Sequence, residues 1–432
     1  MPVVRGGMAS STPTVMVIAT VHWASTTRLC LALAEGGLRV LAVVPPHHAL
    51  RRLESIEAIV LGRRRGQAIR DISDVLASRP VDLVVPADER AIDLVRGVHG
   101  HAAAHPPIAG LTDIAGLIER SLGSASAFTL GGRKSRFVAL AREEGVAVPA
   151  TSVVPDLAVL RAFAAGRRFP LVLKQDDTFG GMGVRIVHDA AQAERAYREL
   201  SANQGLRGAI KEALRRLDPG CLARRARPVT LQQFIAGRPA NRAVACDRGQ
   251  VLAGLSVEVL QTSNATGPAT VVRVVDHDEM AEAARRIVAR LQLSGLVGFD
   301  FMLEAATGRA WLLEMNVRPT QICHLAVDRD SDMIGALAVR LGAPPRHRLA
   351  VVPERTIALY PQEIWRDPNS QHFASAFHDV PWHLPQFIEA YRQPVPFEAE
   401  DWVQRLQRHW RALRRPDSLL ATEAETAKPI PL

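Results

Sequence analysis

A lysine and three glycines lie close together in the segment PLVLKQDDTFGGMGVRIV, residues 170–187. Lys174 ends an apolar run, and Gly180, Gly181 and Gly183 follow it. Glycines let a backbone approach a ligand closely, and their N–H groups together with an ammonium group suit phosphate oxygens. Because the lysine precedes the glycines, the segment is not a Walker loop. The pattern indicates phosphate binding, and a plain glycine hairpin between two strands is the structural alternative.

Two apolar segments further along the chain carry oxygen-bearing side chains. In GFDFMLE, Asp300 lies between two phenylalanines, and in WLLEMNVRP, Glu314 and Asn316 alternate with a methionine and so point to one face. If residues 305–309 form a hairpin, all three side chains converge. Carboxylate and amide oxygens suit a magnesium ion that bridges nucleotide phosphates. The structural alternative is a buried ion pair with Arg318, which falls on the same face.

Lysine is rare in this chain, because only four of the 53 basic residues are lysines. They are Lys134, Lys174, Lys211 and Lys428. In such a background a lysine either persists by chance or marks a place that needs a compact ammonium group where a planar guanidinium would not fit. Lys174, beside the glycines, is a candidate for the second case.

The elements before these residues predict a small α/β domain with a parallel sheet. Continuous apolar runs separated by helical patterns are typical of buried parallel strands. Strands are expected at residues 15–20, 39–45, 81–88 and 107–109. The loop VHWASTT after the first strand contains no glycine, so the G-x-G-x-x-G fingerprint of nicotinamide-binding proteins is missing. Asp88 and Glu89 follow a strand at the edge where ligands bind, although a helix N-cap is the favoured role.

The central region predicts helices that alternate with several strands. Helices are expected at residues 124–145, 156–165 and 279–291, and strands at 171–174, 184–187, 230–235, 243–246 and 251–259. Residues 190–227 indicate a mostly helical and basic excursion, and the segment AGRPAN indicates a turn. After Gly342 the pattern weakens, and the last residues are expected to form a disordered tail.

Composition excludes several classes of protein. At 432 residues and 47% hydrophobic content, the chain is expected to fold into two or three domains. No apolar run reaches the length of a membrane-spanning helix, and the start MPVVRGGMASSTPT lacks the layout of a secretory signal, so we expect a cytoplasmic protein without a membrane partner. The four cysteines contain no C-x-x-C pair, which argues against a disulfide framework and a zinc knuckle.

The net charge of +9 raises the question of a nucleic-acid partner. Aromatic residues make up only 5% of the chain, and no strand interleaves aromatic and basic residues for base stacking. A solvated basic face, or attraction of small anionic substrates, explains the charge more simply. We therefore do not expect nucleic acid as a partner.

The order of these motifs resembles the ATP-grasp superfamily of carboxylate ligases, which includes D-alanine ligase and biotin carboxylase. The ordered set is a lysine helix, a lysine strand, a glycine loop, the segment QFI, and DFM followed by EMNVR. The resemblance implies an α/β domain at residues 1–112, and an α+β ATP-grasp domain of two subdomains at 113–344 with a hinge near 230–237. A C-terminal extension follows at 345–432.

The resemblance also implies roles for individual residues. Lys134 and Lys174 would hold the α- and β-phosphates of ATP, and the loop with Gly180, Gly181 and Gly183 would fold over them. Three further groups match the family: Gln233, Phe234 and Ile235 match the hinge that receives adenine; Asp300, Glu314 and Asn316 match the ligands of Mg²⁺, for which Mn²⁺ is a possible substitute; and Arg318 matches an arginine that faces the reacting carboxylate or phosphate.

Three positions depart from the family pattern. The hinge often carries a glutamate where this chain has Gln233, and Pro239 replaces an acidic residue that contacts ribose. Gly298 stands where D-alanine ligases carry a catalytic arginine. These departures concern nucleotide preference and transition-state stabilisation, and they leave the metal set intact.

The implied reaction is a ligation in two steps. The γ-phosphate of ATP passes to a small-molecule carboxylate to give an acylphosphate, and an amine then displaces phosphate. Lys174, Arg318 and magnesium would neutralise and align the reacting anions, and the glycine loop would exclude water. Two alternatives stay open: a biotin-carboxylase-like carboxylation that uses bicarbonate, and a nucleotide-binding protein without catalysis.

Substrate recognition is harder to predict. Arg242, Arg273, Gln321 and His324 lie near the candidate site in sequence, and each suits either a substrate contact or a structural role. The segment 345–416 has two alternatives, which are packing onto the core and an oligomer contact such as that of a homodimer.

Overall fold

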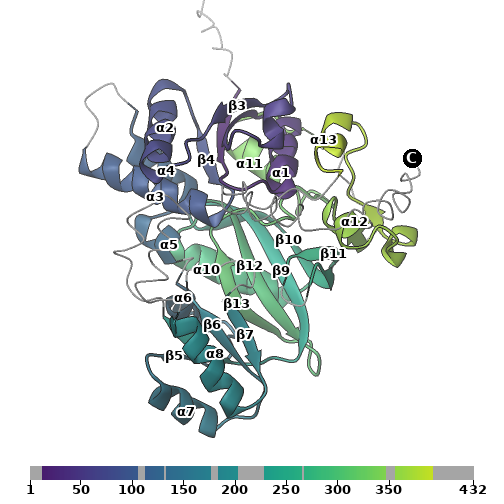
Figure 1. The fold of residues 1–432 in the computed structure, drawn as a ribbon. Helices are drawn as coiled ribbons and strands as arrows, with labels where there is room; N and C mark the ends of the chain where they lie inside the picture. The colour runs from purple at the N-terminus through teal and green to yellow at the C-terminus, as the bar shows by residue number, and fades with distance from the viewer. Residues whose placement is uncertain are drawn as a thin grey trace, which may run out of the picture.

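The computed structural model describes residues 12–105, 112–130, 133–176, 183–202, 228–264, 267–346 and 356–392. Within them the chain forms an α/β structure, as the sequence predicts, and its strands form three sheets. Figure 1 shows the sheets stacked along the molecule, with the N-terminal sheet at the top, a large sheet in the middle and a small sheet at the bottom.

The N-terminal sheet is parallel, and its strand order is β3-β2-β1-β4. Its strands are β1 (Thr14–Ile18), β2 (Arg39–Val44), β3 (Glu57–Val60) and β4 (Leu83–Pro86). The surrounding helices are α1 (Ala24–Glu35), η1 (Ala49–Arg52), α2 (Arg65–Ser78), α3 (Glu89–Ala104) and α4 (Ile114–Leu122). The predicted strands β1, β2 and β4 are confirmed. Strand β3 is not predicted, because its sequence EAIV is short and only half-buried. The strand expected at residues 107–109 lies outside the described residues.

The large sheet has seven strands in the order β13-β12-β9-β10-β11-β14-β15. They are β9 (Gly237–Asp247), β10 (Gln250–Thr262), β11 (Ala269–Val274), β12 (Gly295–Glu304), β13 (Ala310–Asn316), β14 (Thr356–Ala358) and β15 (Phe377–His378). Helices α10 (Asp278–Leu291) and α11 (Met333–Arg340) pack on it. Because β14 pairs with β11, the described part of the segment after residue 345 completes this sheet. It also forms α12 (Gln362–Arg366), η3 (Gln371–Ala374) and α13 (Pro385–Ala390).

The small sheet is antiparallel and has the order β5-β8-β6-β7. Its elements are β5 (Thr151–Val154), α7 (Leu157–Ala165), β6 (Leu171–Gln175), β7 (Val184–Val187), α8 (Ala190–Ala202) and β8 (Val229–Gln233). Helix α7 begins at the predicted place because the Asp156 side chain accepts a hydrogen bond from the Val159 backbone N–H. This sheet has its own apolar cluster, which includes Leu171, Leu173 and Leu231.

Two details of the central region differ from the sequence prediction. The single helix expected at residues 124–145 is two helices, α5 (Ala125–Leu130) and α6 (Lys134–Glu143). The sequence places Gly131 and Gly132 between them, and glycine is a poor helix former. The turn expected at AGRPAN is mostly strand, because residues 237–240 pair with β12 at the start of β9.

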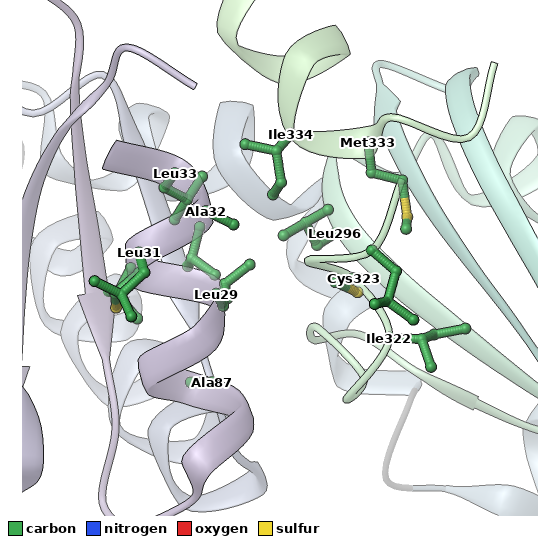
Figure 2. Close-up of a cluster of buried hydrophobic side chains, with 14 of the residues drawn as sticks. Leu29, Leu31, Ala32, Leu33, Ala87, Leu296, Ile322, Cys323, Met333 and Ile334 are labelled. Atoms are coloured by element: carbon green, nitrogen blue, oxygen red, sulfur yellow. The ribbon is translucent and has the colours of Figure 1, made fainter. Parts of the chain in front are cut away.

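The N-terminal domain shares an apolar core with the large sheet. Figure 2 shows α1 packed toward the segment around α11, with Leu29 and Leu33 opposite Leu296 and Ile334. A Cβ on Gly36 would lie 2.9 Å from Cγ2 of Ile334, so a larger residue would push α1 away from α11. This packing fixes the edge of the N-terminal sheet relative to the large sheet, which matters for the contacts of Arg318 described below.

No helix in the described part of the chain combines the length and apolar character needed to cross a membrane.

Candidate functional site

The predicted hairpin of β12 and β13 brings the three oxygen-bearing side chains together. Asp300 lies directly opposite Glu314, and Gly298 lies opposite Asn316. Asn316 Nδ2 donates a hydrogen bond of 2.9 Å to Asp300 Oδ2. The neighbouring Phe299 is buried on the other face, so the alternation read from the sequence is correct. A register shift follows Asp300, and bulges of this kind commonly re-aim side chains at active sites.

Both candidate lysines lie close to these carboxylates. Lys134 is the first residue of α6, and its Nζ lies 3.0 Å from Glu314 Oε2. Lys174 is buried in β6, where the charges of Glu314 and Asp300 act on it. The four residues come from β6, α6, β12 and β13, so the site lies between the small sheet and the large sheet (Figure 1).

The effects of burial and of neighbouring charges on the pKa values of these four residues oppose one another. Burial and the adjacent Glu314 carboxylate raise the pKa of Asp300. Burial alone would raise the pKa of Glu314 too, but the ammonium groups of Lys134 and Lys174 hold it well below its usual range. Burial would lower the pKa of Lys134, and the Glu314 carboxylate outweighs that effect and raises it.

Lys174 is the exception among the site's cations. Burial, assisted by the nearby positive charge of Lys134, lowers the pKa of Lys174 to about 8, although Glu314 and Asp300 favour the charged form. A buried ammonium group with a lowered pKa gains from any further anion placed beside it. Phosphate oxygens are such anions, so this arrangement suits the ligand that the glycine pattern indicated.

Three polar residues of the site are not predicted from the sequence. Asn241 Nδ2 donates to Asp300 Oδ1 at 2.7 Å, and Ser135 Oγ donates to the buried Asp176 at 3.1 Å. Asn241 was missed because AGRPAN was interpreted as a turn, and as a strand it pairs in register with Asp300. Asp176 lies directly after the end of β6 and two residues after Lys174, and this spacing is the signal that could have found it.

Arg318 does not pair with the strand carboxylates. Its Nε donates to Glu89 Oε1 at 2.8 Å, its Nη1 donates to the Pro319 carbonyl at 3.1 Å, and its guanidinium lies 5.2 Å from the Trp23 ring. Burial would lower the pKa of Arg318, but Glu89 outweighs it and raises the pKa. The alternative of an ion pair with the carboxylates of β12 and β13 is therefore not observed. Glu89 from the N-terminal domain takes that place.

Asp88 confirms its favoured interpretation as a helix N-cap. Its side chain accepts a hydrogen bond from the Ala91 backbone N–H at 2.9 Å at the start of α3. It also accepts from the backbone and the hydroxyl of Thr20 at 2.6 Å and 2.7 Å, which ties the ends of β4 and β1 together.

The expected hinge begins at the last residue of β8. Gln233 is exposed and its backbone N–H donates to the Ala150 carbonyl at 2.8 Å, while Phe234 is half-buried and Ile235 is buried. Of the glycine loop, Gly183 is described, and its carbonyl accepts from the Gln175 N–H at 3.0 Å. Gly180 and Gly181 lie outside the described residues.

Two of the suggested substrate contacts lie away from Asp300, Glu314 and Asn316. Arg242 pairs in register with Phe299, the neighbour of Asp300, so it points to the opposite face of the sheet. Arg273 forms an ion pair of 3.1 Å with Glu258 on the same opposite face. These arginines have structural partners and do not join the site.

The other two suggested contacts also have structural partners. Gln321 Nε2 donates to the Ala269 carbonyl at 3.0 Å. His324 Nε2 lies 2.7 Å from a carboxylate oxygen of Asp379, which also pairs with Arg28 of α1. His324 and Asp379 are buried, at 5% and 3% exposure, and Arg28 is nearly buried, at 13%.

The fold resembles several solved structures at low sequence identity. The biotin carboxylase domain of 2-oxoglutarate carboxylase from Hydrogenobacter thermophilus, solved with MgADP, ADP and bicarbonate, has a TM-score of 0.54 and 16% identity, with 78% of this chain and 71% of that chain covered. N5-carboxyaminoimidazole ribonucleotide synthetase from Thermotoga maritima has a TM-score of 0.52 and 14% identity, with 79% of each chain covered. L-amino acid ligase from Bacillus licheniformis has a TM-score of 0.50 and 16% identity, with 77% and 75% covered.

A family model decides the relationship. Residues 134–321 match the model described as the ATP-grasp domain. This part of the chain is an ATP-grasp domain. The match begins at Lys134 and ends after Arg318, so this ATP-grasp domain contains both lysines and the three oxygen-bearing residues. No curated protein matches the chain by sequence.

The donor set of this ATP-grasp domain fits a divalent cation. Among the described residues, no group of three or more histidine, cysteine, aspartate or glutamate side chains is arranged as a metal site. Asp300 and Glu314 supply two adjacent carboxylates, and Asn316 can supply an amide oxygen. Mg²⁺ commonly uses one or two carboxylates and completes its shell with substrate phosphates and water. The raised pKa of Asp300 shows that its negative charge is poorly compensated, which a cation would correct.

Proposed function

We propose that the protein is an ATP-dependent ligase that phosphorylates a small-molecule carboxylate and couples it to an amine. The observation that carries the proposal is the convergence of Lys134 and Lys174 on Asp300 and Glu314 between two sheets. Two ammonium groups facing two carboxylates have the polarity needed for a nucleotide phosphate with a divalent cation. The ATP-grasp fold supports the same proposal.

The proposed roles are those that the resemblance to the ATP-grasp family implies for each residue. Lys134 and Lys174 bind ATP phosphates, with the loop of Gly180, Gly181 and Gly183 over them. Asp300, Glu314 and Asn316 hold Mg²⁺ or Mn²⁺, which when bound neutralises and aligns the phosphate charge. The hinge of Gln233, Phe234 and Ile235 receives adenine between the sheets.

Arg318 is the proposed contact for the reacting anion. Its guanidinium is partly buried at 14% exposure and is held by Glu89 and by the face of Trp23. A held guanidinium stabilises the charge that develops on the transferring phosphoryl group without needing to reorient. The amine then displaces phosphate from the acylphosphate. The domain division 1–112, 113–344 and 345–432 is part of this proposal.

Carboxylation with bicarbonate is a second candidate. It is favoured by the similar fold of the biotin carboxylase domain that was solved with bicarbonate. Both reactions activate a carboxyl group with ATP, and so both use the same phosphate and metal residues. ADP release that requires bicarbonate would favour carboxylation, whereas release that requires a carboxylate and an amine together would favour ligation.

The first experiment measures thermal unfolding of the wild type and of Glu314→Ala with and without MgADP. A ligand at a hundred times its Kd adds about 2.7 kcal/mol to the stability of the folded protein. We expect stabilisation of the wild type and none of Glu314→Ala. Glu304→Ala is the matched control, because Glu304 ends the same strand β12 and its side chain accepts a hydrogen bond from the Thr307 hydroxyl in the turn. Absence of stabilisation in the wild type would contradict the proposed nucleotide site.

A further inference from the structure

Asp300 is held by amide groups on both of its carboxylate oxygens. Asn241 Nδ2 donates to Oδ1 at 2.7 Å and Asn316 Nδ2 donates to Oδ2 at 2.9 Å. The two amides come from β9 and β13, the strands on either side of β12. The carboxylate plane is therefore fixed from both neighbouring strands.

Thr320 fixes which end of Asn241 faces the carboxylate. Its hydroxyl donates to Asn241 Oδ1 at 3.2 Å, so the amide oxygen of Asn241 is occupied and its NH₂ group is turned toward Asp300. Thr320 is itself placed by a hydrogen bond of 3.2 Å from its backbone N–H to the sulfur of buried Cys323. A chain of hydrogen bonds thus runs from Thr320 through Asn241 to Asp300.

Gly298 provides the space for this series of hydrogen bonds. A Cβ at position 298 would lie 2.1 Å from Cγ2 of Thr320, a distance that no side chain tolerates. The threonine methyl group therefore fills the volume beside Gly298, on the strand that carries Asp300 two residues later. A side chain at position 298 and the observed position of Thr320 exclude each other.

We propose that Asn241, oriented by Thr320, is a positioning residue that aligns Asp300 for the divalent cation. This inference rests on the proposed function, in which Asp300 is a metal ligand. Groups that orient a metal ligand fix its lone pairs, and their removal typically costs 10–100-fold in metal affinity or activity. This role explains why position 298 is a glycine, because a side chain there would displace the threonine that orients Asn241.

The test measures how the stabilisation by ADP depends on the concentration of Mg²⁺. Thr320→Val keeps the shape of threonine and removes the hydroxyl donor, and Thr320→Ser keeps the donor. We expect the half-saturating Mg²⁺ concentration to rise about 10-fold in Thr320→Val and to stay near the wild-type value in Thr320→Ser. Asn241→Ala should raise it at least as far.

A double mutant separates positioning from a merely structural contribution. If Thr320 acts through Asn241, adding Thr320→Val to Asn241→Ala should not raise the half-saturating Mg²⁺ concentration further. A purely structural pair would lower the melting temperature of the variants and leave their Mg²⁺ dependence like that of the wild type, and this result would overturn the inference. If the wild type itself shows no response to MgADP, the proposed function fails first.

Discussion

Two buried charge clusters lie in different regions of this molecule and are balanced differently. The junction cluster consists of Arg28, His324 and Asp379, and joins α1, the segment after β13 and the segment after β15. Despite burial, Arg28 and His324 lower the pKa of Asp379, so its charge is well compensated. The site cluster consists of Lys134, Lys174, Asp300 and Glu314.

In the site cluster compensation is incomplete. The pKa of Asp300 is raised and the pKa of Lys174 is lowered to about 8, so one anion and one cation are each less stable in the charged state than in water. Perturbed pKa values of this kind gather at functional sites, because groups arranged for a ligand are not arranged for each other. The comparison teaches that a buried cluster with balanced charges stabilises the fold. A buried cluster with unbalanced charges gains when a ligand of the right charge binds to it.

The largest effect is expected from breaking the junction cluster. Asp379→Ala leaves the guanidinium of Arg28 buried without its carboxylate, and removing one partner of a buried ion pair typically costs about 3–5 kcal/mol. We expect a clear loss of stability in chemical unfolding. Asp367→Ala is the control, because Asp367 is 42% exposed and lies 3.8 Å from Arg366. Equal stability of the two variants would show that the junction cluster is not compensated as described.

A smaller effect of opposite sign is expected in the site cluster. Lys174→Met removes a buried charge whose pKa lies below its ordinary value of 10.5, so the unliganded protein should become more stable at neutral pH, by up to about 3 kcal/mol. The same variant should lose affinity for MgADP. This combination is the usual relation between stability and function at a binding site.

Lys134→Met is the matched comparison for that variant. The pKa of Lys134 is raised by its ion pair with Glu314, so its removal should lower the stability of the unliganded protein. Thermal unfolding of both variants without ligand measures whether each substitution raises or lowers the stability of the protein. Destabilisation by both substitutions would remove the distinction between the two lysines.

The smallest effect concerns pH. Between about pH 8 and 10.5 the unfolded chain binds more protons at Lys174 than the folded chain, so this group makes the unliganded protein more stable as pH rises through that window. Phosphate binding favours the charged form, so MgADP affinity should fall above about pH 8, by at most about tenfold per pH unit. Titration calorimetry in two buffers measures the accompanying proton uptake. Lys174→Met should show no such uptake, and an equal uptake would assign it to another group.

Periodicity predicted most of the elements and the convergence of Asp300, Glu314 and Asn316, because both depend on neighbours in sequence. The alternation around Asp300 and Glu314 is a property of two short strands, and the hairpin between them is local. The N-terminal parallel strands are continuous apolar runs, which is the pattern of burial on both faces. The alternation of residues along each strand thus determines the sheet face on which these residues lie.

The contacts that sequence reasoning missed are the distant ones. Glu89 and Arg318 are 229 residues apart, and the ion pair exists because α1 and α11 share a core that brings β4 near the end of β13. Asn241 was hidden by a proline and a glycine that suggested a turn, whereas pairing with β12 drew residues 237–240 into the strand. In both cases tertiary packing overrode the local signal.

The hydrogen bond of 2.8 Å between Thr27 and Tyr391 joins residues 364 positions apart. A ribosome adds about 5–20 residues per second, so roughly 20–70 s separate the synthesis of these two partners. Within that interval, α1 lacks its packing partner α11 until residues 333–340 are made, and the edge of β11 lacks its partner until β14 is made. The nascent protein therefore exposes an apolar helix face and then an open strand edge before these elements are synthesised, and a chaperone would protect these two surfaces.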